Sequence, residues 1–429
     1  MRPNLPPLVT HPLRDYWSKI KAFRPNARLY LVNVVISGIS MGVFRLLLNF
    51  YVLSLGFNEA LLGRLITTSS LTSLIIALPA GYLADIIGRK RSLLTGGILT
   101  SLSIAGMVIW PLVPVFYALN VVRGFSQSLW SITMSPFLME NSGEEERTYL
   151  FSFGLGFQTL SGFVGNWVGG YLPSWIGTRM DISPTGSMAY GTSIAIVALM
   201  FGTGLIPLFF LRTRRQEGDE RTVFAPIAYA MEHPGLLGKL VGPMLITALG
   251  AGLVMPFMNV FFRNVHNQPD QVIGTLFAWG SLAMGLGLLV APALADRFGK
   301  IQIVVITQGL SIPFLIMLGF SPFFWMSAAA YYVRLALMNM SSPVYETFVM
   351  EHVEPSARAM VASLTSMAWS FGWAFSPSIS GSLQVKYGFS IPFLGTISMY
   401  TVAIFMYWLF FWKNKAPQGS SEPSTPITP

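Results

Sequence analysis

Four ionisable side chains lie within long apolar stretches of the sequence, where a charge needs a specific partner. Three are arginines, Arg45, Arg123 and Arg334, and the fourth is Glu346. Such an arginine binds an anionic group of a solute or sets the pKa of a nearby carboxylate; alternatively, it bonds backbone carbonyls at a glycine-rich helix contact. A partly buried carboxylate can take up and release protons near neutral pH, whereas one at the rim of an apolar segment forms a salt bridge, here with Arg358.

Polar and aromatic residues continue the helical faces of these arginines. Asn49 follows Arg45 by one turn, and Gln127 and Trp130 follow Arg123 by one and two turns. Aromatic side chains in apolar helices also act as packing or interfacial anchors. We predict a substrate-binding set and one proton-coupling carboxylate, which are Arg45, Asn49, Arg123, Gln127, Trp130, Arg334 and Trp369 for the substrate and Glu346 for the proton.

The composition places these residues in a membrane protein. Of the 429 residues, 53% are hydrophobic and only 10% are charged, against about 25% in an average soluble domain. This excludes a soluble enzyme. The chain has no cysteine, its four histidines are scattered, and neither a nucleophile constellation nor a phosphate-binding loop occurs. We therefore predict a protein that is not an enzyme and has no metal, cofactor or nucleic acid partner.

Apolar stretches of about 20 residues, the length that crosses a bilayer, recur along the chain. We predict twelve spans, at 29–55, 61–84, 92–110, 114–139, 148–172, 188–211, 237–262, 271–295, 301–320, 323–349, 358–383 and 391–412. Most of the 27 lysines and arginines fall on the side of the N-terminus, which predicts cytoplasmic termini. The predicted parts are a cytoplasmic N-terminal segment (1–28), two six-helix bundles (29–211 and 237–412), a cytoplasmic linker (212–236) and a disordered cytoplasmic tail (413–429).

The two halves of the chain repeat with a constant offset of 211 positions. The charged residues at this offset include Asp85 and Asp296, Arg89 and Lys300, Arg123 and Arg334, Glu140 and Glu351, and Arg147 and Arg358. Leucines and glycines recur by chance in two apolar segments, but charged residues at the same offset do not. Corresponding spans run in the same sense, so the halves form a parallel repeat whose two bundles can rock about a central site.

The segment from Gly81 to Lys90, GYLADIIGRK, resembles the signature loop of the major facilitator superfamily. The segment from Ala295 to Lys300, ADRFGK, is similar to the second copy of that loop. The resemblance extends over essentially the whole chain. It implies an all-α membrane protein with twelve transmembrane helices in two six-helix bundles, which transports its substrate by alternating access.

The resemblance also implies a charge latch on the cytoplasmic face, which holds the bundles together in one state and releases them in the other. Its predicted members are Asp85, Gly88, Arg89, Glu140, Arg147, Asp296, Glu351 and Arg358. In this latch Gly88 allows a tight turn, and Glu140 and Glu351 stand near Arg147 and Arg358 as acid–base pairs. The alternative is an ordinary surface turn, which is basic because cytoplasmic loops are basic.

A glycine-rich stretch from Ser161 to Gly170 is similar to the antiporter motif of drug exporters, although Asn166 stands where that motif has a proline. Small residues four positions apart also serve close helix packing. Arg123 is similar to an arginine of drug–proton antiporters, but Gln127 replaces the glycine that follows it there.

These features predict a secondary active transporter in the plasma (inner) membrane, a monomer that exports a small organic solute in exchange for protons. The alternative is uptake or exchange of an organic anion. This alternative is favoured by the excess of basic residues within the spans, which contain three arginines and one acidic residue. A receptor or lipid scramblase of the same architecture is a third interpretation, for which the residues give no positive support.

Overall fold

The computed structural model describes residues 25–140, 144–211, 234–353 and 358–412, and every regular element in these ranges is a helix. The helices of the first half are α2 (Pro25–Ser54), α3 (Glu59–Ile87), α4 (Arg89–Ile109), α5 (Val113–Glu140), α6 (Glu144–Met180), α7 (Ser187–Gly204) and α8 (Ile206–Phe209). Those of the second half are α10 (Pro234–Val254), η1 (Met255–Phe257), α11 (Met258–Asn264), α12 (Asp270–Phe298), α13 (Lys300–Phe320), α14 (Phe324–Glu351), α15 (Arg358–Tyr387) and α16 (Ser390–Phe411).

These helices follow the predicted spans, with two differences. The sixth span is divided between α7 and α8, and the seventh is broken into α10, a 3-10 turn and α11. The second break surrounds Pro256, which has no backbone N–H to donate within a helix. By length and composition, eight of the described segments can cross a membrane. The remaining long helices, α5, α6, α14 and α15, contain charged residues.

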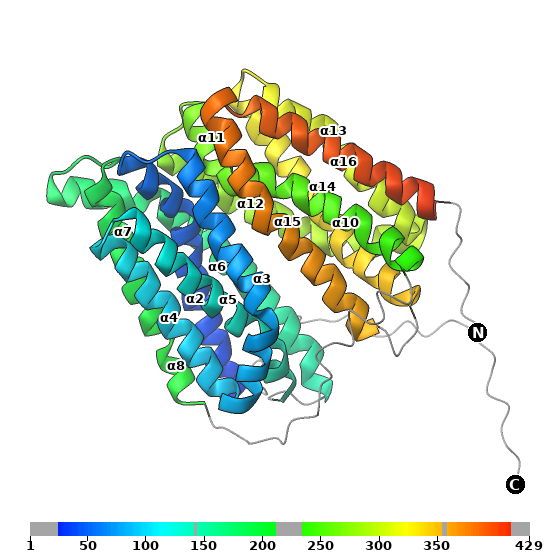
Figure 1. The fold of residues 1–429 in the computed structure, drawn as a ribbon, viewed down its shortest axis with the longest axis horizontal. Coiled ribbons are helices and arrows are strands. Elements are labelled where there is room, and N and C mark those ends of the chain that lie inside the picture. Colours follow the sequence, from blue (N-terminus) through cyan, green and yellow to red (C-terminus); the bar gives the residue numbers. More distant parts are fainter. Residues whose placement is uncertain (1–24, 141–143, 212–233, 354–357, 413–429) are drawn as a thin grey trace, which may run out of the picture.

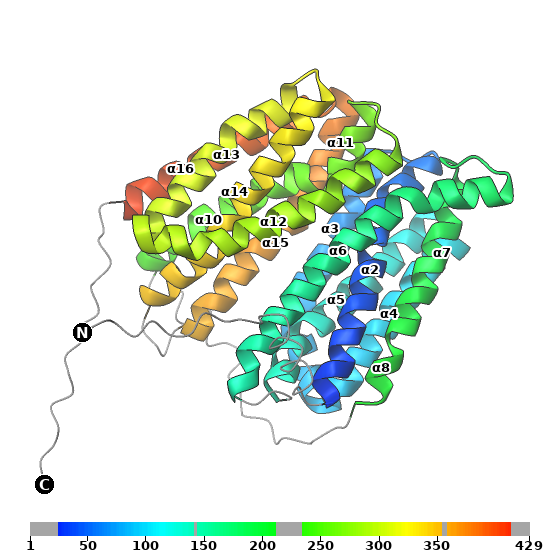
Figure 2. The same ribbon diagram turned by 180° about the vertical axis from the view of Figure 1, so that it is seen from behind.

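The helices form two bundles that meet at one end and diverge toward the other (Figure 1 and Figure 2). We call the end where the bundles meet the closed end. It contains the beginnings of α3 and α12, and there α3 packs against α15 and α12 packs against α6. We call the other end the open end; α2 begins and α16 ends there (Figure 1). The all-α, two-bundle fold expected from the sequence is confirmed.

Two equivalent glycine contacts bring the bundles together at the closed end. Gly63 of α3 lies against the Pro377 carbonyl of α15, and Gly274 of α12 lies against the Asn166 carbonyl of α6. Gly63 and Gly274 are 211 positions apart, as are Asn166 and Pro377. The two halves of the interface are therefore related by the same repeat as the sequence, and the absence of a glycine side chain permits the close backbone approach.

The glycine-rich stretch of α6 is accounted for by this packing. A Cβ on Gly165 would lie 3.0 Å from the Cα of Gly42 on α2, and one on Gly170 would lie 2.7 Å from the Asp270 carbonyl of α12. The residues that resemble an antiporter motif thus allow α6 to contact both its own bundle and the opposite one.

Several predicted segments lie outside the described residues. These are nearly all of the N-terminal segment (1–28), nearly all of the linker (212–236) and the C-terminal tail (413–429). The division of the chain into these parts stays a prediction.

Gly274→Val should prevent closure at the closed end. A Cβ at this position would lie 2.6 Å from both the Asn166 carbonyl oxygen and the Gly170 Cα, and overpacking costs about 1–3 kcal/mol. The chain has no cysteine, so Thr67→Cys supplies a unique thiol at a residue whose hydroxyl accepts a hydrogen bond across the bundles. A membrane-impermeant maleimide added at the closed end should label this thiol faster in the Gly274→Val protein.

The matched control is Gly309→Val on α13, where a Cβ would meet no atom within 4 Å. Its labelling rate should equal that of the parent protein. Equal rates for both valine variants would show that the contact at Gly274 does not hold the bundles closed.

Candidate functional site

Asn49 and Arg45 share the face of α2 that is turned toward the second bundle. The Asn49 amide donates to the Pro256 carbonyl and to the Asn259 Oδ1, both at 2.8 Å, and is buried between the bundles. Arg45 lies one turn nearer the open end and is exposed. Since the bundles separate in that direction, Arg45 faces the space between them. Within the described part of the chain it has neither a hydrogen-bond nor an ion-pair partner.

Arg123 of α5 lies close to Arg45. Its Nη2 donates to the Ser69 hydroxyl of α3 at 2.9 Å, and its central guanidinium carbon lies 5.3 Å from the centroid of the Phe44 ring. Its Nε is buried and has no partner among the described residues. The two guanidiniums are near enough to repel each other, and no carboxylate of the described chain forms an ion pair with either. The site therefore carries concentrated positive charge.

Arg334, the repeat equivalent of Arg123, has a different environment. It is only 2% exposed, and it donates to the Tyr400 hydroxyl at 3.1 Å and to the Met255 sulfur at 3.3 Å. Both partners belong to the second bundle. Met255 is the repeat equivalent of Phe44, so each of these arginines packs against the same position of the first span of its half. In this conformation the structure does not bring Arg334 to the space between the bundles.

The other predicted substrate residues are distributed along the inner helices. Gln127 is exposed on α5. Trp130 is half-buried and packs against an apolar cluster of the first bundle. Trp369 is 41% exposed and lies 6.5 Å from Trp373 by ring centroids. Trp369, Trp373 and Pro377 are spaced four residues apart, so they lie on one face of α15. Pro377 contacts α3, and the two tryptophans follow it toward the open end.

The acidic residues of α14 lie near the open end. Glu346 is exposed and has no hydrogen-bond or ion-pair partner within the described ranges. Glu351 forms its ion pair with Lys300 of α13. The expected pair of Glu351 with Arg358 is not among the ion pairs of the described residues. The Arg358 Nε donates to the Met350 carbonyl at 2.9 Å.

The two signature loops have the same backbone conformation. Gly88 has φ +86° and Gly299 has φ +93°, values that favour glycine, and each glycine ends one helix and precedes the next. Arg89 begins α4. The side chains of the remaining predicted latch residues, Asp85, Glu140, Arg147 and Asp296, lie outside the described part. Both loops are at the open end, where the bundles are apart. Because the side chains of these four residues are not described, the latch role stays a prediction.

Arg263, which follows the predicted span 237–262, is not among the predicted site residues, and neither are Tyr190 and Asp270. The structure brings these three residues together across the closed end. One signal was present in the sequence, because Asp270 corresponds by repeat to Glu59, a second acidic residue at the beginning of a span.

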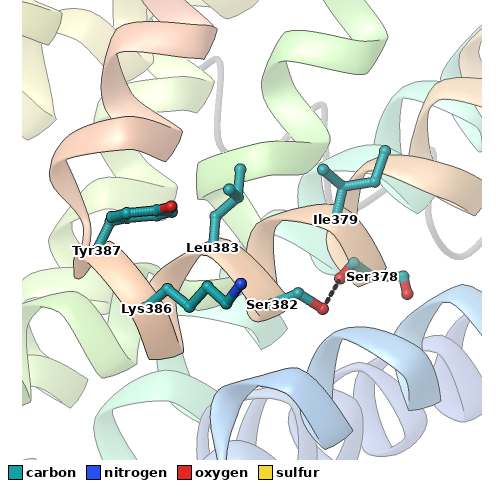
Figure 3. Close-up of a pocket in the computed structure, with 6 residues that line it drawn as sticks. All are labelled: Ser378, Ile379, Ser382, Leu383, Lys386 and Tyr387. Atoms are coloured by element: carbon teal, nitrogen blue, oxygen red, sulfur yellow. Dashed lines mark hydrogen bonds between the residues drawn. The ribbon is translucent and has the colours of Figure 1, made fainter.

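A surface recess of about 500 Å³ lies apart from these residues, along one side of α15 (Figure 3). Figure 3 shows that all its labelled side chains come from this helix, with Lys386 as the charged one. None of the predicted site residues lines it. No cluster of histidine and acidic residues that could hold a metal occurs in the described ranges.

Comparisons with known proteins agree with this architecture. The multidrug resistance protein MdtG of Dickeya zeae is 26% identical over 376 residues, which cover 84% of this chain and 88% of that protein. The niacin transporter NiaP of Acinetobacter baylyi is 26% identical over 151 residues, which are 35% of this chain and 34% of that protein. The crystal structure of the nucleoside transporter NupG has the same fold, with a TM-score of 0.73, 14% identity, and coverage of 91% of this chain and 100% of that chain.

The match to a family is more extensive still. Residues 30–241 and 240–428 each match the Major Facilitator Superfamily, so both halves of the chain are covered. The match agrees with the two repeated bundles and with the signature loops at Gly88 and Gly299. The chain therefore belongs to the Major Facilitator Superfamily, and it is a multi-pass membrane transporter and not an enzyme.

Proposed function

We propose that the protein exports small, partly apolar organic compounds and binds an anionic group of the compound between Arg45 and Arg123. The observation that carries this proposal is that the Arg123 guanidinium lies 5.3 Å from the ring of Phe44, the residue before Arg45, and that neither arginine has a described carboxylate partner. Two like charges in a low-dielectric site repel each other strongly, and an anion placed between them relieves that repulsion. Guanidinium groups also bind carboxylates through two parallel hydrogen bonds.

The residues around the arginines suit a partly apolar compound. Trp369, 41% exposed, and Trp373 lie on α15 of the opposite bundle and offer aromatic surface. Gln127 supplies an exposed amide on the same helix as Arg123. An aromatic carboxylate, with an apolar ring and one anionic group, fits this combination of groups.

The direction of transport follows from the orientation that the basic residues predict. If both termini are cytoplasmic, the open end faces the cytoplasm, and the structure is the inward-facing state in which an exporter takes up its substrate. The relative MdtG, which is named a multidrug resistance protein, supports export. Uptake or exchange of an organic anion is the second candidate, supported by the same arginines and by the relative that is named a niacin transporter.

Proton exchange is the proposed driving reaction, with Glu346 as the carboxylate that takes up the proton. Glu346 is exposed on α14 and has no partner in the described chain, so its protonation breaks no ion pair seen in the structure. By contrast, Glu351 is held by Lys300 and Asp270 by Arg263.

Arg45→Lys and Arg45→Ala should weaken the binding of benzoate to the purified protein, with alanine the weaker of the two. Loss of a charge-assisted hydrogen bond corresponds to about 1.5–3 kcal/mol, or about 10- to 150-fold in affinity. Lysine keeps the charge but not the planar fork of donors. Isothermal titration with benzoate, and with benzyltrimethylammonium as a cation that also has one phenyl ring, measures the effect.

Arg334→Gln is the matched control, because it removes a guanidinium that is buried within one bundle. It should lower the free energy of unfolding by about 2 kcal/mol and leave the benzoate affinity unchanged. Tighter benzoate binding in the Arg45→Ala protein would contradict the anionic substrate and leave a cationic or neutral one.

Glu346→Gln should abolish transport driven by a pH gradient but preserve exchange of labelled for unlabelled substrate. A fixed neutral side chain still allows the bundles to rock, whereas it cannot carry a proton. Transport into inverted and right-side-out vesicles, with and without a pH gradient, distinguishes the two activities. An unchanged dependence on the gradient would place proton coupling on another residue.

A further inference from the structure

A polar cluster at the closed end joins the two bundles through an arginine that the substrate site does not use. Arg263, near the end of α11, forms an ion pair with Asp270, the first residue of α12. Across the interface, the Arg263 Nη2 donates to the Tyr190 hydroxyl at 2.6 Å, and its guanidinium carbon lies 3.3 Å from the centroid of the Phe50 ring. The Tyr190 hydroxyl donates to Asp270 at 2.6 Å.

Both charges of the cluster lie in the second bundle, and the first bundle contributes only a neutral aromatic surface. When the bundles separate, Arg263 and Asp270 can move together and keep their ion pair. Separation then breaks only the interactions of this pair with the Tyr190 hydroxyl and the Phe50 ring. A pair divided between the bundles would instead leave two unpaired charges in a poorly hydrated interface, which is strongly unfavourable. The arrangement therefore suits an interface that must open and close again in every cycle.

We propose that Arg263, positioned by Asp270, is the gate cation of the closed end. It stabilises the closed arrangement by docking on Phe50 and Tyr190, and its release opens the substrate site toward the opposite side of the membrane. The proposal rests on the proposed transport function, but the gate itself depends on the interface and requires no particular substrate.

The gate is connected to the substrate site through one helix. Phe50, Asn49 and Arg45 lie on two successive turns of α2. Phe50 contacts the gate cation, Asn49 bonds Asn259 of the second bundle, and Arg45 faces the space between the bundles. A ligand that draws α2 toward or away from the second bundle at Arg45 thus acts directly on the contact of Phe50 with the gate.

The equivalent position of the other half carries no such cluster among the residues that the structure describes. Glu59, the repeat equivalent of Asp270, accepts an exposed hydrogen bond of 3.1 Å from Asn264. The pair from Arg263 to Asp270 is largely buried, with exposures of 22% and 6% for the two side chains. The gate is consequently one-sided, and substitutions at Arg263 and at Glu59 should have different effects.

The gate is tested with two spin labels and no substrate. Leu112 and Phe323 are exposed at the closed end, in equivalent positions of the two bundles, and the chain has no other thiol to label. Cysteines at these positions carry the labels, and double electron–electron resonance measures the distance between them in nanodiscs. The short distance reports the closed arrangement and the long distance reports the open one.

Phe50→Leu should raise the ratio of long to short distances by about 2- to 30-fold, the range that corresponds to removal of a cation–π interaction. Arg263→Gln should raise it further, Arg263→Lys should restore part of the short population, and Tyr190→Phe should have an intermediate effect. Arg179→Gln is the control, because Arg179 lies 5.6 Å from the ring of Trp175 within the same helix and spans no interface.

Unchanged distance distributions in the Phe50→Leu and Arg263→Gln proteins would overturn the gate. If Arg263→Gln fails to fold, Phe50→Leu decides alone, since it leaves the ion pair intact. The result is separable from the substrate proposal. A shift in distances together with unaltered benzoate binding in Arg45→Ala would retain the gate and reject the anionic substrate, and the reverse combination would reject the gate alone.

Discussion

A charge within the membrane-embedded part of a protein must be compensated by protein groups or by a ligand, because water is scarce there. Arg263 satisfies this condition through Asp270, and Arg334 does so through a tyrosine hydroxyl and a thioether of its own bundle. Arg45 and Arg123 are close together and have no carboxylate partner in the described chain. Arg123 bonds a serine hydroxyl much as Arg334 bonds a tyrosine hydroxyl, so the proposed substrate pair differs from Arg334 in exposure: Arg45 is exposed and Arg123 is half-buried, whereas Arg334 is buried.

The position of this pair depends on how the bundles meet. The glycine contacts at Gly63 and Gly274 bring α3 against α15 and α12 against α6 at one end, and the helices diverge from there (Figure 2). The amide of Asn49 closes the interface just beyond Arg45. A compound bound at the arginines is consequently reached from the open end and separated from the other side by the closed end. The contacts at Gly63 and Gly274 are related by the repeat of the chain, and they allow the bundles to pivot about them without loss of the packing within each bundle.

Much of the fold could be predicted from the sequence, since hydropathy defines spans and charged residues at a constant offset define the repeat. The site was less predictable. The sequence presents Arg123 and Arg334 as equivalent, and only the helices around them make one half-exposed and the other buried. The pairing of Arg263 with Asp270 and the bond from Arg334 to Tyr400 depend on contacts between residues of different helices. Such contacts leave no periodic signal in either helix.

The central claim is that an anionic group binds between Arg45 and Arg123. Crystals soaked with 4-bromobenzoate test it most directly, because the anomalous signal of bromine locates the ring and the density defines the carboxylate. We expect the carboxylate within hydrogen-bond distance of both guanidiniums, with the ring toward Trp369. A ligand bound only at the recess beside Lys386, with the two arginines unoccupied in a saturated crystal, would contradict it.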